Sequence, residues 1–184
     1  TMHARVGSVD VLVADETEAV SVAQRYLQLV GAVTSSFRRA DQAPLRKVVP
    51  VNRAEIYDVR RAINLILDVE SSIELRPQFG VGVVTVIGAI NGRPVGLVAN
   101  NPGHLGGAID RDAADKMARF IQLCDAHRLP IVSLCDTPGF MVGTSAEEQA
   151  QVRHFGRLFV VAASSTVPWV TIVLRKGYGL GAQA

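Results

Sequence analysis

The sequence predicts an α/β fold, and three features of its second half carry that prediction. Residues 81–90 are rich in β-branched side chains, Asn91-Gly92 is a strong hairpin signal, and residues 94–100 supply a returning strand. Residues 129–135 form a short, continuously apolar segment of the kind that is buried on both faces of a parallel sheet. Helical patterns separate the later strands, so we expect right-handed βαβ crossovers.

The first residues predict a strand followed by a helix. Residues 9–14 have the composition of a short strand. Asp15 and Glu18 then form a capping pair, in which Asp15 caps the helix and Glu18 reaches back. Apolar residues recur at helical spacing from there to Gly31, which is a plausible end of the helix.

A linker and a second helix are expected next. Residues 32–50 have no steady hydrophobic period and end at a proline, so we interpret them as a linker. Asn52 and Glu55 repeat the capping pattern and predict the start of a helix. Its apolar stripe is formed by Ile56, Val59, Ile63, Ile66 and Leu67.

Two further helices and a last strand complete the expected fold. Asp110 precedes a helix with one apolar face, and a Thr-Ser pair with glutamates three residues further on, within 144–148, starts another. The inward face of this last helix is expected to contain Val152, Phe155, Phe159 and Ala162. Residues 168–174 read as the final strand.

Composition excludes several classes of protein. The chain has 184 residues, of which 48% are hydrophobic and 20% charged, enough for the core of one domain. The net charge of +2 comes from 19 basic and 17 acidic residues spread along the chain, which argues against a nucleic-acid surface. No apolar stretch reaches the roughly 20 residues of a membrane span. Two cysteines in apolar contexts and the lack of a secretory signal pattern favour the cytoplasm.

Two glycine-rich turns follow buried strands. Residues 136–143 read DTPGFMVG and residues 177–182 read GYGLGA. Ligands bind at the carboxyl ends of strands in open α/β sheets, and free N–H groups at helix starts favour an anion or a developing oxyanion. Glycine allows a carbonyl to approach such an amide closely. The pattern indicates oxyanion stabilisation, although a purely structural turn has the same composition.

A third glycine-rich segment, residues 100–108, is either a binding loop or a flexible connection. It contains His104, a conceivable general base with no acidic partner at a telling spacing. The cysteine, histidine and aspartate residues within 124–136 lack the spacing of metal ligands, and Cys124 belongs to an apolar helical face, so packing is favoured over a metal site. Nucleophile-elbow, dinucleotide-binding and P-loop patterns do not occur.

Taken together, these segments resemble the carboxyltransferase subunits of acetyl-CoA and propionyl-CoA carboxylases. Matching segments occur in the family's order along the chain. They are Val49-Pro50, Tyr57-Asp58-Val59-Arg60, Phe79-Gly80, Asn91-Gly92-Arg93-Pro94-Val95-Gly96, Ala99-Asn100, Cys124-Asp125, Ile131, Asp136-Thr137-Pro138-Gly139-Phe140, Gly143-Thr144, Thr166-Val167-Pro168 and Arg175-Lys176. Residues 1–29 are similar to the end of the family's N-terminal half, so nearly the whole chain is covered.

The resemblance implies a crotonase-like ββα superhelix, incomplete at its C-terminus. Residues 1–45 would be the tail of the N-terminal carboxyltransferase half with a linker, and residues 46–184 the C-terminal carboxyltransferase domain. The implied activity is transfer of a carboxyl group from carboxybiotin, held on a carrier protein, to an acyl-CoA of the acetyl or propionyl class. This half would bind the biotin side and be inactive alone. The implied partners are a biotin carboxylase, a biotin carboxyl carrier subunit and further copies in a homo-oligomer, as dimer pairs or a hexamer.

The resemblance also assigns site residues. The family's oxyanion turn falls on residues 179–181, with the backbone amides of Leu180 and Gly181 as donors. The carboxybiotin pocket would be lined by Gly139, Phe140, Gly179 and Ala182. Gln183 stands where many propionyl-CoA enzymes have an acid that helps to choose the acyl chain, so the resemblance does not single out propionyl-CoA.

Three alternatives stay open at this point. A biotin-dependent acyl-CoA decarboxylase would use the same pocket in reverse. A non-catalytic assembly module would retain the fold, but loss of glycine from residues 177–181 would be typical of it, and three glycines remain. A crotonase-type hydratase or isomerase is disfavoured because no paired glutamates occur near Gly106-Gly107.

Overall fold

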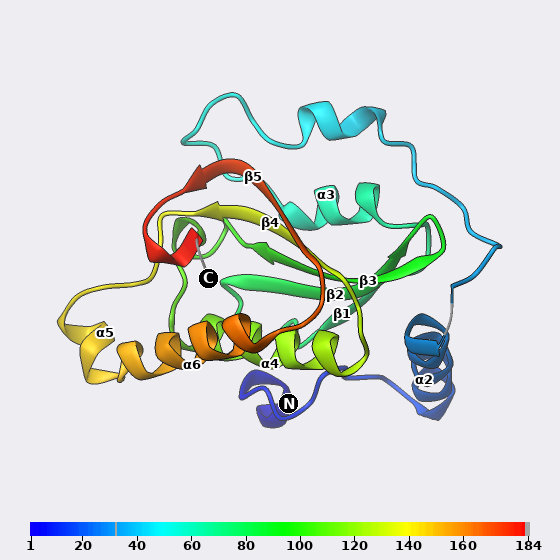
Figure 1. Cartoon of the computed structure of the whole chain (residues 1–184), viewed down its shortest axis with the longest axis horizontal. Coiled ribbons are helices and arrows are strands. Elements are labelled where there is room, and N and C mark those ends of the chain that lie inside the picture. Colours follow the sequence, from blue (N-terminus) through cyan, green and yellow to red (C-terminus); the bar gives the residue numbers. More distant parts are fainter. Residues whose placement is uncertain (32, 183–184) are drawn as a thin grey trace.

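The structure of the protein is a computed structural model that describes residues 1–31 and 33–182. Its strands form one sheet in the order β1-β2-β3-β4-β5 (Figure 1). The strands are β1 (Ile73–Leu75), β2 (Val83–Ile90), β3 (Arg93–Asn100), β4 (Ile131–Thr137) and β5 (Trp169–Gly177). The first three are antiparallel, whereas β3, β4 and β5 run parallel. The predicted α/β class is confirmed.

The predicted hairpin is confirmed as the pair β2 and β3. Asn91 and Gly92 both have positive φ values, 51° and 72°, as a two-residue hairpin turn with the right-handed strand twist requires. The Asp68 carboxylate accepts hydrogen bonds from both turn amides, at 3.1 Å from Asn91 N and 2.7 Å from Gly92 N. The turn is therefore fixed both by its own sequence and by a buried acid before the sheet.

Helices cover both faces of the sheet. On one face lies α3 (Val59–Ile66), and on the other α4 (Arg111–Ala126) and α6 (Gln151–Ser164) lie side by side (Figure 1). Successive residues of β2 point to opposite faces, so Val83 and Ile87 join the core under α4, while Val84 and Val86 join the core under α3. The sheet thus has an apolar core on each side.

Two predicted helix starts are confirmed. The helix α2 (Glu16–Gly31) follows Asp15, whose carboxylate accepts from Glu18 N at 2.8 Å. The helix α4 follows Asp110, which accepts from Ala113 N at 2.8 Å. A short helix α1 (Met2–Arg5) precedes both. Side-chain caps of this kind satisfy N–H groups that a helix start leaves without partners.

The expected strand at 9–14 and the expected helix start at Asn52 are wrong. Residues 9–14 are irregular, and within the described chain Asp10 O accepts a hydrogen bond from Arg76 N, just after β1. Asn52 caps an isolated turn through Ala54 N instead of a helix. The helix α3 begins seven residues later, because Asp58 takes the N-cap position and accepts from Arg60 N.

The expected single helix after residue 144 is two helices. The short α5 (Thr144–Glu148) and α6 are separated at Ala150, which has a φ of 55°. Gln151 is buried and donates to Ile109 O at 3.2 Å, which draws the start of α6 toward the sheet. Val152 is 66% exposed, so its predicted inward position is wrong, whereas Phe155 packs on the core.

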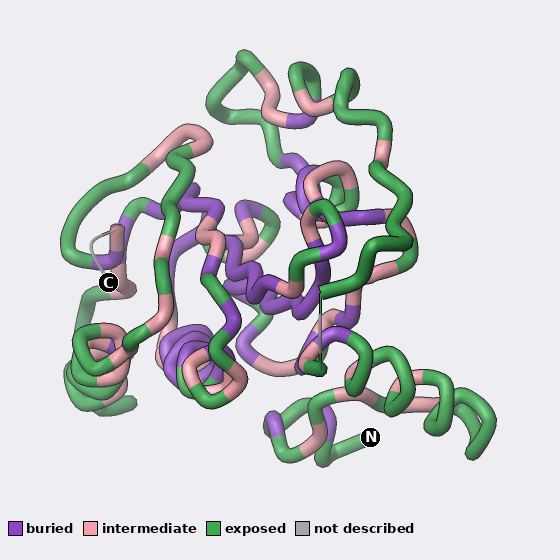
Figure 2. The backbone as a smooth tube through the Cα atoms, turned by 45° about the vertical axis from the view of Figure 1, so that its right-hand side comes forward, coloured by how far each residue is buried: buried purple, intermediate pink, exposed green. Residues whose placement is uncertain are grey.

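The edge strand β5 and much of the first 58 residues are open to solvent. Figure 2 shows burial concentrated in the sheet and in α4, with exposed backbone at both sides. From residue 33 on, the predicted linker is irregular apart from a short 3-10 helix, η1 (Ala43–Lys47). No helix among the described residues is long and apolar enough to cross a bilayer.

Candidate active site at the carboxyl ends of the parallel strands

The three glycine-rich segments meet at one edge of the sheet. They follow β3, β4 and β5, and they contain the 3-10 helix η2 (Leu105–Gly107), the turn 138–143 and the 3-10 helix η3 (Leu180–Ala182). Because these strands are parallel, their carboxyl ends lie together, where ligands bind in open α/β sheets. The fold therefore assembles the segments that the sequence singled out.

The turns after β4 and β5 are in direct contact. A Cβ atom at Gly181 would lie 3.0 Å from Gly139 Cα and 3.2 Å from Phe140 N. Gly139 itself has a φ of 114°, a conformation that other residues rarely adopt. Glycine is thus required at both positions, because any side chain at 181 would separate the two turns.

Three backbone amides belong to the two turns that meet here. The 3-10 hydrogen bond of η3 runs from Ala182 N to Gly179 O at 3.3 Å, so the amides of Leu180 and Gly181 precede the first helical bond and have no acceptor within the helix. Gly139 O accepts from Ile109 N, and Met141 N donates to Ile109 O. The amide of Phe140, between them, therefore points to the opposite side, toward η3.

The side chains of the other predicted site residues do not all face this contact. Leu180 is 63% exposed, and Ala182 is half-buried behind it. The ring of Phe140 stacks on Phe155 of α6, with centroids 3.7 Å apart, so its backbone and not its ring faces the contact. Gln183 lies outside the described residues.

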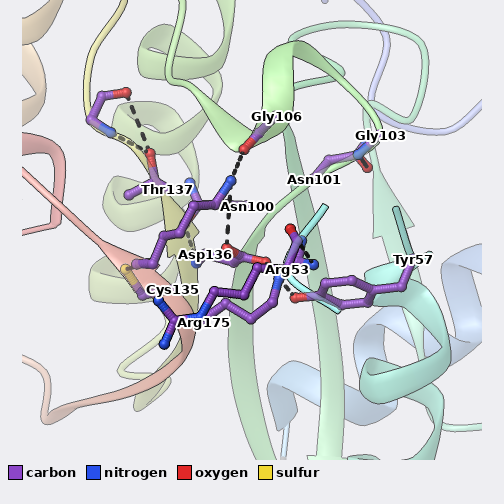
Figure 3. Close-up of polar contacts among 12 residues, drawn as sticks. Arg53, Tyr57, Asn100, Asn101, Gly103, Gly106, Cys135, Asp136, Thr137 and Arg175 are labelled. Atoms are coloured by element: carbon purple, nitrogen blue, oxygen red, sulfur yellow. Dashed lines mark hydrogen bonds and ion pairs between the residues drawn. The ribbon is translucent and has the colours of Figure 1, made fainter. Parts of the chain in front are cut away.

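A buried carboxylate holds the strands beneath these turns. Asp136, at the end of β4, is fully buried, and Figure 3 shows it between Tyr57 and Arg175. Its Oδ2 accepts from the Tyr57 hydroxyl at 2.8 Å and from Arg175 Nε at 2.9 Å. Its Oδ1 has no hydrogen-bond partner among the described residues, with Lys176 Nζ at 3.8 Å. Asp136 N donates to Asn100 Oδ1 at 3.0 Å.

Arg175 and Lys176 tie two further loops to this acid. The register between β4 and β5 shifts between Cys135 and Thr137, and such bulges re-aim side chains near functional sites. Arg175 donates to the carbonyls of Arg53 and Glu55, while Lys176 donates to Gly106 O (Figure 3). The loops before α3 and after β3 are thereby fixed relative to η3.

Comparison with known proteins decides the family. The model of the carboxyl transferase domain family matches residues 1–184. The chain belongs to this family.

Solved structures and curated relatives agree with this assignment. A single-chain, multi-domain long-chain acyl-CoA carboxylase is 52% identical, with a TM-score of 0.97 over 98% of this chain and 18% of that one. The transcarboxylase 12S hexamer is 33% identical, with a TM-score of 0.89 over 98% of this chain and 36% of that one. A putative propionyl-CoA carboxylase beta chain of Bacillus subtilis is 38% identical over 84% of this chain and 31% of its own length.

This carboxyl transferase domain spans well under half the length of these relatives. Its neighbours are crotonase-fold domains, so the predicted crotonase-like fold is confirmed. The predicted kinship with acetyl-CoA and propionyl-CoA carboxylase carboxyltransferases is confirmed as well.

Sequence reasoning missed the buried network of this carboxyl transferase domain. Asp136, Tyr57 and Arg175 belong to segments that carry the family resemblance, but none was assigned a role from the sequence. Burial, followed by the hydrogen bond to Asp136, raises the pKa of Tyr57 well above its ordinary value, so its hydroxyl stays a donor. The strand β5 is mostly exposed, although the sequence predicted a buried strand there, and the charged pair Arg175-Lys176 at its end is the sequence signal that could have pointed to a buried acid.

The structure also tests what the sequence indicated for two other side chains, His104 and Cys124. No acidic residue stands at a telling sequence spacing from His104, but the fold brings its Nε2 to 3.0 Å from the Oδ2 of Asp110, the N-cap of α4. That contact gives His104 a structural role beside η2. Cys124 is fully buried in the core, as its apolar context predicted, and burial raises the pKa of its thiol to about 12. A thiol held protonated in this way is a poor metal ligand.

Proposed function

We propose that this domain forms the biotin side of a carboxyltransferase site, in which a carboxyl group passes from carboxybiotin on a carrier protein to an acyl-CoA of the acetyl or propionyl class. The observation that carries the proposal is the contact between Gly181 and the Gly139-Phe140 turn. In the proposed arrangement the backbone amides of these two turns would point to one position at the carboxyl end of the sheet. The confirmed family supports the reaction type.

The amides would stabilise the charge that develops during transfer. The N–C bond of carboxybiotin breaks, and its electron pair leaves negative charge on the ureido group. The acyl-CoA loses its α-proton to form an enolate, whose carbon bonds the carboxyl carbon, and the proton ends on the biotin nitrogen. The N–H groups of Leu180, Gly181 and Phe140 would donate to the ureido oxygen. One such donor in a preorganised site is worth about 3 kcal/mol of transition-state stabilisation.

The remaining parts of the proposal concern assembly. Residues 46–184 would be the C-terminal half of a carboxyltransferase subunit, and residues 1–45 the tail of its N-terminal half with a linker. A facing copy of the subunit in a homo-oligomer would complete the site, which agrees with the exposure of Leu180. A biotin carboxylase and a carrier subunit would supply carboxybiotin in the cytoplasm, and Gln183 would contribute to the choice of acyl chain.

Gly181→Ala in the intact protein tests the proposal. The added Cβ meets Gly139 and Phe140 and displaces the amides, so carboxyl transfer to acetyl-CoA and propionyl-CoA should fall roughly 100-fold or more in kcat. Gly181→Pro removes the amide donor itself and should have the same effect. The matched control is Gly156→Ala, because a Cβ at this exposed helical position meets no atom within 4 Å.

The possible results test the assignment of the amides and the assignment of the reaction separately. Unchanged kcat in a folded Gly181→Pro variant would exclude the amide assignment. Absence of transfer to any acyl-CoA by the unmodified protein, with release of CO₂ from a carboxylated acyl-CoA instead, would replace the transferase with a decarboxylase. Loss of activity in Gly181→Ala and Gly181→Pro alone, with Gly156→Ala unaffected, supports the proposal.

A further inference from the structure

A cavity lies on the side of the sheet that α2 and α4 cover. It has a volume of about 730 Å³ and lies between α2, β1 and α4. None of the residues of η3 or of the turn 138–143 lines it. The apolar part of its lining includes Val11, Val22, Ile73, Leu75, Phe120 and Leu123. This size and apolar lining are typical of a site for a small molecule.

Three cationic side chains line the same cavity. Lys116, Arg76 and Arg119 all contribute to its wall, against one acidic lining residue, Asp10. Lys116 is 1% exposed and donates to Val83 O, its one hydrogen-bond acceptor within the described chain, although an ammonium carries three donors. Buried cations with unused donors are costly unless an anion or acceptor reaches them.

Arg76 shows the same shortage of acceptors. Its side chain is 6% exposed, and one terminal nitrogen pairs with Asp10 at 2.8 Å. Its Nε has no hydrogen-bond partner among the described residues. Burial lowers the pKa of Arg76, with Arg119 acting in the same direction and Asp10 opposing them. The cationic end of the cavity therefore has donors to spare beside an apolar wall.

We propose that this cavity binds a small anionic amphiphile, an unbranched apolar chain that ends in a single carboxylate or phosphate. The apolar chain would lie along α2 and α4, and the head group would accept hydrogen bonds from Lys116 and Arg76. The three lining cations exceed the one lining acid, Asp10, by two positive charges, which is enough to neutralise one such head group. The site is independent of the proposed transfer reaction, because no residue assigned to that reaction lines it.

Binding is measured on the intact protein by calorimetry with sodium decanoate, decyl phosphate and 1-decanol. Decanoate or decyl phosphate, or both, should bind at least tenfold more tightly than 1-decanol, which has the same chain without the charge. The comparison of the two anions identifies the head group. Equal binding of 1-decanol would overturn the anionic part of the proposal, and no binding of either anion would overturn it entirely.

Two substitutions on one helix locate the site. Val22→Trp fills the cavity from α2 and should weaken binding of the anionic probe at least tenfold. Val20→Trp, on the same helix, is the control, because Val20 is exposed and does not line the cavity. Equal affinities in both variants contradict the location. Should Val22→Trp fail to fold, amide exchange of the unmodified protein decides: the probe should slow exchange in residues 116–123, and unchanged exchange there overturns the proposal.

Discussion

At the scale of single residues, Asp136 determines how the site is held together. One of its oxygens accepts from Tyr57 and Arg175, while the other has no hydrogen-bond partner among the described residues and only Lys176 nearby, at 3.8 Å. A buried carboxylate with so few partners depends strongly on each that it has, because removal of one leaves charge without compensation. We therefore expect the placement of the two turns above it to depend on the pairing of this acid.

Tyr57→Phe tests that dependence. The substitution keeps the ring, over which the Arg175 guanidinium lies at 4.7 Å, and removes only the hydroxyl that donates to Asp136. The free energy of unfolding should fall by about 1–3 kcal/mol, the cost of a buried acceptor without its donor. Thermal or urea unfolding of the intact protein measures the change, and Tyr178→Phe, at an exposed tyrosine, is the matched control. Equal stabilities of the two variants would show that water replaces the Tyr57 hydroxyl.

The site could be predicted from the sequence only where its signals are local. The glycine turns at 136–143 and 177–182 stand out by composition, and the family resemblance assigned their amides. Tyr57 and Asp136 are 79 residues apart, and the bulge that turns Arg175 toward Asp136 arises from the register of two strands. Neither has a local pattern, so the network emerged only from the fold.

At the scale of elements, local chemistry decided which predictions succeeded. The starts of α2 and α4 and the hairpin turn depend on side chains within a few residues, and all three were predicted correctly. Residues 9–14 have strand composition but no partner strand among the described residues, whereas β1 is short and owes its existence to pairing with β2. Strand formation depends on contacts between distant segments, which composition does not encode.

Two glycine substitutions test the packing of these elements in opposite directions. Gly156→Ala on the exposed side of α6 meets no neighbouring atom and should raise the free energy of unfolding by about 0.5–1 kcal/mol, because alanine loses less entropy in a helix. Gly96→Ala in β3 would place a methyl group against Cys124 Sγ, in the core between the sheet and α4. This substitution should lower the free energy of unfolding by about 1–3 kcal/mol. Unfolding curves of the two variants check both signs. A loss of stability in Gly156→Ala would mean that another chain packs on this face of α6.

At the scale of the whole molecule, the two cores make the sheet the rigid centre of the protein. Both faces of β2 are buried, and Lys116 of α4 is enclosed in the same interior. Burial lowers the pKa of Lys116 from 10.5 to about 8, with Arg60 and Arg76 acting in the same direction and Glu74 opposing them. The stability of the whole fold is therefore linked to the protonation of one side chain.

The sign of this linkage predicts how stability changes with pH. Below pH 8 Lys116 is charged in the folded and the unfolded chain, so the folded state carries the full cost of burying the ammonium. Between pH 8 and 10.5 the unfolded chain holds a proton that the folded chain has released, and folding becomes more favourable as pH rises. The gain should reach about 2 kcal/mol between pH 7.5 and 9.5.

Comparison with Lys116→Met isolates this contribution. The variant keeps an unbranched apolar chain in the interior but has no proton to release, so the raised thiol pKa values of Cys124 and Cys135 affect both proteins alike and cancel in the difference. Melting temperatures of both proteins are measured from pH 7.5 to 9.5 without added amphiphile, because a bound anion would raise the pKa of Lys116. The melting temperature of the wild type should rise steadily relative to that of the variant across this range. A constant difference would mean that an acceptor or counter-ion already satisfies Lys116 in the intact protein, and the cavity beside it would then be filled by the protein itself.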